Sequence, residues 1–236
     1  LWTSNYENVY SHPELMIPWY PILGNHEYRG NTQACLDYSK VSRRWEMPAR
    51  YYTKVLDLPT EKASASSKGS NRTTATLRLV FIDTTPLIDK YREDTATYPD
   101  ACKQDKQAQL QWLDSVLTAA KERWVVVVGH HPLYAKTNKD KSERTDLQNS
   151  VGKILSQHKN VSLYVNGHIH NFQHIKHGSV DYITNSSGSL SRKVKAVEGT
   201  QFCSPLAGFS ILSANNKELV LRMIDSKGNV LYEVRQ

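Results

Sequence analysis

The chain has 236 residues and a hydrophobic content of 39%, which is enough to bury a core and excludes a disordered chain. No run of apolar residues approaches the roughly 18 that a membrane-spanning helix needs. The formal net charge of +7 indicates either an attraction for anionic partners or a basic surface. No basic stripe is interleaved with aromatic residues, so nucleic acid is not expected as a partner.

Three cysteines lie far apart in the chain. None belongs to a CxxC pair, which excludes a zinc knuckle and a thioredoxin-type site. Cys102 and Cys203 both lie in predicted loops and could form a disulfide bridge in an oxidising compartment. Cys35 lies on a predicted helix and is expected to be a small core residue. The cysteines therefore leave the redox compartment open.

Hydrophobic patterns predict alternating strands and helices over the first two thirds of the chain. Apolar residues spaced by four, three and four positions predict a helix from about Gln33 to Trp45. A second apolar stripe predicts a helix over Lys103–Arg123, and a third helix is expected over residues 146–157. A polar loop is predicted over residues 61–76. The predicted strands are Trp19–Leu23, Tyr51–Leu56, Leu77–Ile82, Trp124–Val128 and Val161–Asn166, and a short helix is predicted over Trp2–Tyr10.

The last third of the chain has an antiparallel pattern. Phe172–His177 and Val180–Thr184 flank Gly178-Ser179, which predicts a hairpin. Three more strands, joined by Asn- and Gly-containing turns, are predicted over residues 208–214, 218–224 and 230–234. Two mixed β-sheets packed face to face, with helices outside, accommodate both parts of the chain. The predicted fold is therefore α/β, a four-layer αββα sandwich in a single domain over residues 1–236.

Three short strings each follow an apolar run that ends at a glycine. They are Gly24-Asn25-His26-Glu27, Gly129-His130-His131-Pro132 and Gly167-His168-Ile169-His170. A buried strand that ends in this way turns its loop into a crevice at the rim of the sheet. Neutral nitrogen and amide-oxygen donors that meet there are suitable ligands for a metal ion of borderline character. The five donors are Asn25, His26, His130, His168 and His170.

Each string alone has a simpler explanation. Gly24-Asn25 is an ordinary turn sequence, and a His-x-His pair often occurs by chance on an exposed strand. Turn chemistry does not require His26, however, and the start of a helix does not require two imidazoles at residues 130–131. If the chain is extended at His168 and His170, both rings point to the same side and could hold one metal ion or two adjacent ions.

Together, and in this order, the strings resemble the motifs GNH(D/E), GHxP and GHxH of the calcineurin-like metallophosphoesterases. Three further stretches are similar to the small, mammalian-type purple acid phosphatases: Pro18-Trp19-Tyr20, residues 38–45 and Asn171-Phe172-Gln173. The resemblance covers nearly the whole chain and is weakest over residues 61–76 and 87–102.

The resemblance implies a role for each matching residue. Asn25, His130 and His168 match ligands of the second metal ion, and His170 matches a ligand of the first. His26 matches the histidine that contacts the substrate phosphate or protonates the leaving alkoxide. His131 stands where the mammalian-type enzymes carry a tyrosine, so it is expected behind the ligands or near the substrate.

The aspartates and the iron-binding tyrosine that complete the family's metal centre have no match in this sequence. The chain is therefore expected to begin after them, with about 60 residues, the size of two strand-helix units, preceding it. In that case the domain lacks its first strand-helix units and the fold is incomplete at the N-terminus. The other explanation is a catalytically dead protein.

The resemblance implies a phosphomonoester hydrolase of the acid phosphatase type. Its cofactors would be two metal ions, iron with a second iron, zinc or manganese, and a metal-bound hydroxide would attack phosphorus. A phosphorylated small molecule or a phosphoprotein is the expected substrate, and an extracytoplasmic (periplasmic or secreted) location is expected from the resemblance alone. A phosphodiesterase acting on nucleotides, a non-catalytic metal-binding homologue and a structural single-metal protein remain alternatives, and the oligomeric state is open.

Overall fold

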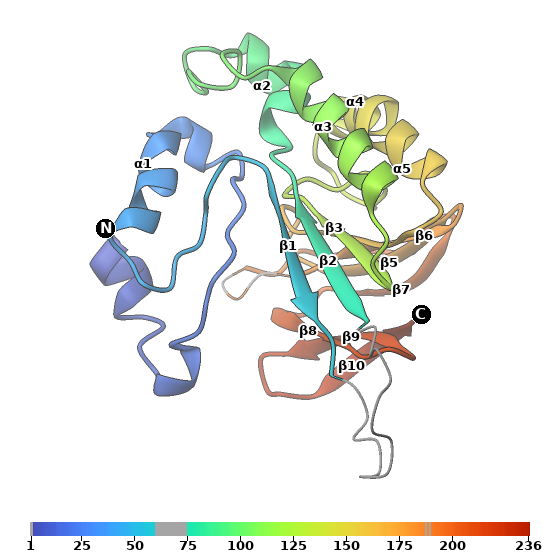
Figure 1. Cartoon of the computed structure of the whole chain (residues 1–236). Coiled ribbons are helices and arrows are strands. Elements are labelled where there is room, and N and C mark those ends of the chain that lie inside the picture. Colours follow the sequence, from blue (N-terminus) through green and yellow to red (C-terminus); the bar gives the residue numbers. More distant parts are fainter. Residues whose placement is uncertain (1, 60–74, 187, 189) are drawn as a thin grey trace.

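The computed structural model describes residues 2–59, 75–186, 188 and 190–236. The loop predicted over residues 61–76 lies almost entirely outside the described residues. Figure 1 shows a large sheet with helices on one face and a smaller sheet on the other. The predicted architecture of two packed sheets flanked by helices is confirmed.

The larger sheet has seven strands in the order β1-β2-β3-β4-β6-β5-β7. Its centre is parallel, because β2, β3, β4 and β6 pair in the same direction, and antiparallel strands lie outside this centre. Parallel strands bring their carboxyl ends to the same edge of the sheet. The strands are β1 (Tyr52–Asp57), β2 (Thr76–Phe81), β3 (Trp124–Val128), β4 (Val161–Asn166), β5 (Phe172–His177), β6 (Val180–Thr184) and β7 (Thr200–Ser204).

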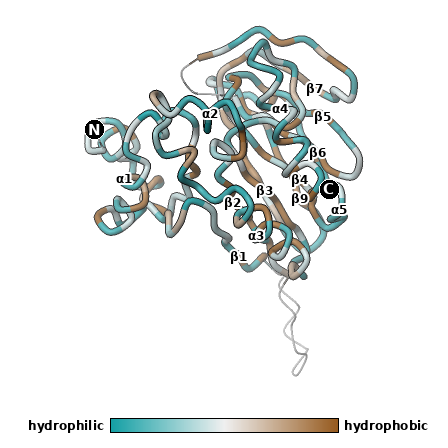
Figure 2. Tube along the Cα trace, turned by 90° about the horizontal axis from the view of Figure 1, so that it is seen from above, coloured by the Kyte–Doolittle hydropathy of each residue, from teal (hydrophilic) through white to brown (hydrophobic). Residues whose placement is uncertain are grey.

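The apolar strand β3 is buried on both faces. Val125 and Val127 point into the core beneath the helices, while Trp124 and Val126 point into the core between the two sheets. A strand covered on both sides needs a continuous apolar sequence, which explains the unbroken run of residues 124–128. Figure 2 shows such hydrophobic stretches along the inner strands of the molecule.

The smaller sheet has the order β10-β9-β8 and contains antiparallel pairs alone. Its strands are β8 (Gly208–Ala214), β9 (Leu219–Asp225) and β10 (Val230–Arg235). Leu221 and Met223 of β9 pack against the core between the sheets. Gly208 lies opposite Asp225, and a Cβ at residue 208 would lie 2.0 Å from the carbonyl oxygen of Ile224, so only glycine fits this pairing.

Helices cover the outer face of the larger sheet. The longest, α3, begins where the Asp105 side chain accepts a hydrogen bond of 2.9 Å from the Ala108 amide, and it buries Leu113 and Leu117. A short π-helical turn, Gln148–Gly152, joins α4 to α5. The α-helices are α1 (Thr32–Asp37), α2 (Asp89–Glu93), α3 (Lys106–Ala119), α4 (Lys141–Leu147) and α5 (Lys153–Gln157), and the other short helices are η1 (Thr3–Glu7), η2 (Pro13–Leu15), η3 (Glu27–Arg29), η4 (Tyr38–Lys40) and η5 (Thr85–Leu87).

The N-terminal region differs from the prediction in two places. The strand predicted over Trp19–Leu23 is an extended segment with a single β-bridge, between Trp19 and Trp45. The helix predicted to reach Trp45 ends at Lys40. The chain reverses there, because the Ser39 hydroxyl donates a hydrogen bond to the Met47 carbonyl and accepts one from the Met47 amide. Tyr38 and Trp45 still pack together, with ring centroids 5.9 Å apart, so the apolar spacing serves an aromatic cluster instead of a helix.

The cysteine prediction is wrong in one respect. Cys203 lies on β7, a strand that the sequence did not indicate, and Cys102 and Cys203 are both free. Cys35 is buried on α1 as expected. Among the described residues, no helix is both long and apolar enough to cross a membrane.

Candidate metal centre

Two of the three motif glycines allow a neighbouring segment to approach closely. A Cβ on Gly24 would lie 2.8 Å from Cε1 of the His130 ring, and a Cβ on Gly129 would lie 2.5 Å from the Tyr164 hydroxyl. The Gly24 amide donates a hydrogen bond of 2.8 Å to Glu27, which closes the turn that carries Asn25 and His26. Gly24 and Gly129 therefore make room for the ring or hydroxyl of a neighbouring segment, whereas a Cβ on Gly167 would meet no atom within 4 Å.

Side chains from three distant parts of the chain meet at the carboxyl edge of the parallel strands. His130 Nε2 lies 3.1 Å from Asn25 Oδ1 and 3.1 Å from His168 Nδ1. Asn25 and His168 are buried, and His130 is half-buried. One nitrogen of each ring and one amide oxygen therefore face a common point.

The turn that carries His168 and His170 is not extended, contrary to the prediction. Both histidines have a left-handed backbone, with φ of 71° and 59°, and the Ile169 amide donates a 2.9 Å hydrogen bond to the Gly167 carbonyl around His168. This is the rare, strained form of the γ-turn. The turn is held from both sides, because Gly167 N donates to the His130 carbonyl and Arg192 N donates to the His170 carbonyl. Strain of this kind persists only where the surrounding structure imposes it.

A buried carboxylate supports His168 from behind. Glu143, on α4, accepts a hydrogen bond of 3.1 Å from His168 Nε2, and its other oxygen accepts from Lys90 Nζ at 2.7 Å and from Tyr91 Oη at 2.8 Å. Burial alone would raise the pKa of Glu143, but the hydrogen bonds from His168, Lys90 and Tyr91 outweigh it and lower the pKa to about 2. The ionised carboxylate fixes the proton of His168 on Nε2, which leaves Nδ1 free to act as a donor atom.

His131 reaches the same carboxylate through a chain of hydrogen bonds. The hydroxyl of Thr84 accepts from the His131 amide and lies 2.8 Å from His131 Nδ1, while His131 Nε2 lies 3.3 Å from the Tyr91 hydroxyl, which donates to Glu143. His130, His131 and His168 offer ring nitrogens within 4.8 Å of one another. Both nitrogens of His131 have hydrogen-bond partners, however, so the geometry favours a positioning residue behind the ligands.

The imidazoles of the cluster are neutral at physiological pH. Burial, followed by the electrostatic effects of the neighbouring His168 and His26 rings, lowers the pKa of His130 to about 3. Burial also lowers the pKa of His168, against the opposing effect of Glu143. Neutral imidazole is the form that binds a metal ion.

The donor set fits a metal centre. Three imidazoles and an amide oxygen suit iron, zinc or manganese. His170 Nδ1 is buried and has no hydrogen-bond partner among the described residues, as expected of a nitrogen that coordinates a metal ion. The structure thus brings Asn25, His130 and His168 together, while His170 follows on the same turn.

His26 lies at the edge of this cluster. It is exposed and directly precedes η3. The preceding residue, Asn25, lies 3.1 Å from His130 Nε2, so the backbone of His26 is beside the cluster.

The sequence analysis missed two buried carboxylates near the cluster. Glu143 lies in a polar segment without any distinguishing pattern. Asp83 lies two residues after the end of β2, and this position after a buried parallel strand could have identified it. The Asp83 carboxylate accepts a hydrogen bond from the Tyr28 hydroxyl. The Gln109 side chain accepts a hydrogen bond from the Asp83 amide and donates one to the Asp83 carbonyl. Burial raises the pKa of Asp83 to about 7.

Asp83→Asn is expected to stabilise the protein more at high pH than at low pH. The folded-state pKa of Asp83, about 7, lies above the ordinary value of 3.8. Ionisation of Asp83 therefore costs stability progressively as the pH rises from about 4 to 7, and asparagine removes this cost. The gain in unfolding free energy should increase by about 2–3 kcal/mol between pH 5 and pH 8. Urea unfolding at both pH values measures it, and an equal gain at both would contradict the raised pKa.

Comparison with known proteins agrees with the motif pattern. The sequence model of the calcineurin-like phosphoesterases matches residues 2–172. Tartrate-resistant acid phosphatase type 5 of Homo sapiens is 28% identical over 248 aligned positions, which cover 98% of this chain and 71% of that protein. Purple acid phosphatase 7 of Arabidopsis thaliana is 30% identical over 193 positions, covering 79% of this chain and 53% of its own length.

A solved structure shares the fold over almost the whole chain. GAP50, described as the anchor in the inner membrane complex of Plasmodium, superimposes with a TM-score of 0.78 at 24% identity. The match covers 99% of this chain and 71% of that one. At this identity the likeness concerns the fold alone.

Proposed function

Because the chain belongs to the calcineurin-like phosphoesterase family, we propose that it is a metal-dependent phosphomonoester hydrolase of the acid phosphatase type, acting through a dinuclear metal centre. The observation that carries the proposal is the approach of Asn25, His130 and His168, from three distant segments, to one point at the edge of the sheet. Neutral nitrogen and oxygen donors arranged in this way are suited to binding a metal cation.

The proposed ligands divide between two ions. Asn25 Oδ1, His130 Nε2 and His168 Nδ1 would hold one ion, and His170 would contribute to the other. Iron together with a second iron, zinc or manganese is compatible with this donor set. When bound, such a pair of ions polarises a phosphoryl group and lowers the pKa of coordinated water.

The chain's own residues position and protonate the substrate. Glu143 keeps the His168 ring in one tautomer and one orientation. His131 acts through Tyr91 on the same carboxylate. His26 is exposed at the cluster and is proposed to donate a hydrogen bond to the phosphate and a proton to the departing oxygen.

A panel of esters tests the proposal. The full chain, loaded with iron, zinc or manganese, is expected to hydrolyse p-nitrophenyl phosphate faster than bis(p-nitrophenyl) phosphate, and to lose activity when a chelator removes the metal. Faster hydrolysis of the diester would support a phosphodiesterase instead. Two bound metal ions per chain without hydrolysis of either ester would contradict both and support a non-catalytic metal-binding homologue.

Substitution of His26 is expected to have an effect that depends on the leaving group. In His26→Ala, kcat for β-glycerophosphate should fall by about 100-fold, because an alkoxide needs a proton to leave. For p-nitrophenyl phosphate the loss should be much smaller, because p-nitrophenolate leaves without one. Steady-state kinetics on both esters measure the difference, with His12→Ala, an exposed histidine before η2, as the control. Equal losses on both esters would argue against proton donation.

Residues 1–236 are proposed to form one domain, which is supported by Leu79 and Val128, since each packs against both hydrophobic cores. An extracytoplasmic location is proposed from the resemblance to acid phosphatases. A phosphorylated molecule is the proposed substrate.

A further inference from the structure

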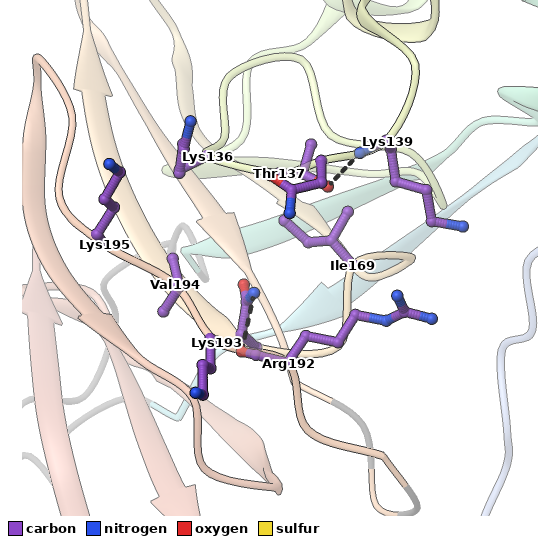
Figure 3. A pocket seen from close by; sticks show the side chains of 10 residues that line it. Lys136, Thr137, Lys139, Ile169, Arg192, Lys193, Val194 and Lys195 are labelled. Carbon is purple, nitrogen blue, oxygen red and sulfur yellow. Dashed lines mark hydrogen bonds between the residues drawn. The ribbon is translucent and has the colours of Figure 1, made fainter.

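A cavity of about 470 Å³ lies beside the histidine cluster, and its lining is strongly basic (Figure 3). The loop after β3 contributes Lys136 and Lys139, and the segment before β7 contributes Arg192, Lys193 and Lys195. Among the residues that the structure describes, no carboxylate lines the cavity. We refer to these five side chains and the space between them as the cationic cavity.

The charges of the cationic cavity are not compensated within the part of the chain that the structure describes. None of its five cations forms an ion pair with a carboxylate there, whereas many other lysines and arginines do, such as Lys90 with Glu143. Burial lowers the pKa of Lys139, the Glu143 carboxylate opposes this effect, and the nearby charge of Arg192 lowers the pKa further. Five like charges around one space repel one another, and an anion in that space would relieve the repulsion.

The walls of the cavity are fixed by hydrogen bonds to a buried glutamine and its neighbour. The Gln173 side chain accepts from the Lys136 amide at 2.7 Å and donates to the Lys136 carbonyl at 2.8 Å. It also donates to Asn171 Oδ1, and Asn171 in turn lies 3.4 Å from the Arg192 carbonyl. The two loops are therefore held apart at a set distance, so the cavity is preformed.

The cationic cavity adjoins the proposed metal centre. Ile169, which lines it, stands between His168 and His170. The Arg192 amide donates a hydrogen bond of 2.9 Å to the His170 carbonyl. In Figure 3 the side chains of Arg192 and Lys139 extend toward one side, while Lys136 and Lys195 lie at the opposite side. A ligand can therefore extend from the histidines past Lys139 and Arg192 to Lys136 and Lys195.

We infer that the cationic cavity binds a phosphate group of a ligand whose other phosphate lies over the histidine cluster, so that compact polyphosphorylated small molecules are the substrate class. The assignment of the first phosphate rests on the proposed function. Arginine and lysine are the side chains that recognise phosphate in proteins. The volume suits a small ligand and is too small for a folded partner.

Calorimetric titration tests the inference on the full chain with inorganic tripolyphosphate, orthophosphate and a peptide with one phosphoserine as probes. Dialysis of the metal-loaded protein removes unbound metal ions, so that polyphosphate does not bind them in solution. Tripolyphosphate is expected to bind at least about tenfold more tightly than orthophosphate, because it reaches both ends of the cavity. The double variant Lys136→Gln/Lys195→Gln should weaken tripolyphosphate about tenfold.

A matched pair of lysines controls for overall charge. Lys121 and Lys159 are exposed and do not line the cavity, so Lys121→Gln/Lys159→Gln removes the same charge elsewhere and should change the affinity less than about twofold. Equal weakening in both double variants, or equal affinities for tripolyphosphate and orthophosphate, would overturn the inference. So would tighter binding of the phosphopeptide than of tripolyphosphate. Thermal unfolding of each variant verifies that it is folded.

The titration does not depend on turnover. If metal-loaded protein fails to hydrolyse p-nitrophenyl phosphate but binds tripolyphosphate through Lys136 and Lys195, the hydrolase proposal fails and the anion-binding cavity stands. If hydrolysis occurs but tripolyphosphate binding does not respond to the two lysines, the cavity is excluded and the hydrolase proposal stands.

Discussion

Replacement of His168 by alanine is expected to lower phosphatase turnover by at least about 10³-fold in the metal-loaded protein. His168 Nδ1 faces His130 Nε2 at 3.1 Å, so its removal takes one of three converging donors from the proposed ion. Loss of an ion that stabilises charge on phosphate costs several kcal/mol in the transition state, and each 1.36 kcal/mol is about a factor of ten. Turnover of p-nitrophenyl phosphate and metal analysis of the same samples measure the effect.

The unusual backbone of His168 sets the control for this experiment. Because φ of His168 is 71°, the backbone is strained with histidine at this position and stays strained with alanine. Glycine adopts this conformation freely. His168→Gly therefore removes the same ligand while relieving strain. Both variants should be inactive, and the glycine variant should be at least as stable as the alanine variant. Full turnover in the metal-loaded glycine variant would refute the ligand assignment.

Glu143→Ala is expected to lower the unfolding free energy by at least about 1–3 kcal/mol, the cost of leaving a buried hydrogen-bond donor without its acceptor. Glu143 is 2% exposed and accepts hydrogen bonds from Lys90, Tyr91 and His168. Without it, a lysine charge and two hydrogen-bond donors lose their acceptor. Metal affinity should also fall by about 10- to 100-fold, because the His168 ring loses the group that orients it. Denaturant unfolding and metal titration measure the two effects.

Two further variants separate charge from hydrogen bonding at this position. Glu143→Gln keeps an oxygen that accepts from Lys90, Tyr91 or His168 but removes the negative charge, so its losses should lie between those of the wild type and Glu143→Ala. Glu93→Ala, an exposed glutamate at the end of α2, should change stability by less than about 0.5 kcal/mol. If Glu143→Ala behaves like Glu93→Ala, the proposed support of His168 is wrong.

Part of the positive charge of the chain is concentrated at one place, the cationic cavity. Sequence alone left a dispersed basic surface and attraction for anions as alternatives for the charge of +7. Two segments of the chain, separated by some fifty residues, contribute the cations of one cavity. The first carries Lys136 and Lys139, and the second carries Arg192, Lys193 and Lys195. This clustering favours anion binding beside the histidines, and the tripolyphosphate titration tests it.

Strands in the parallel centre of the sheet were predictable almost to the residue. Trp124–Val128, Val161–Asn166 and Val180–Thr184 have the predicted bounds, because strands buried on both faces require apolar runs that end abruptly at polar residues or glycine. The aromatic stripe from Gln33 to Trp45 misled the prediction, because its side chains meet through a chain reversal that Ser39 fixes by contacts with Met47. A long-range hydrogen bond of this kind leaves no periodic signal.

The sequence by itself determined which side chains reach the edge of the sheet, because a glycine at the end of a strand and the donors after it are adjacent in the chain. It therefore indicated Asn25, His130 and His168, and the structure brings them together. Only the tertiary structure decided what stands behind and beside them: Glu143 as the acceptor for His168, and the lysines of the cationic cavity. These groups come from polar loops and a short helix, where solvent-exposed and buried charges have the same local sequence pattern. Packing alone distinguishes them, because a charge becomes costly or useful only when other parts of the chain exclude water from it.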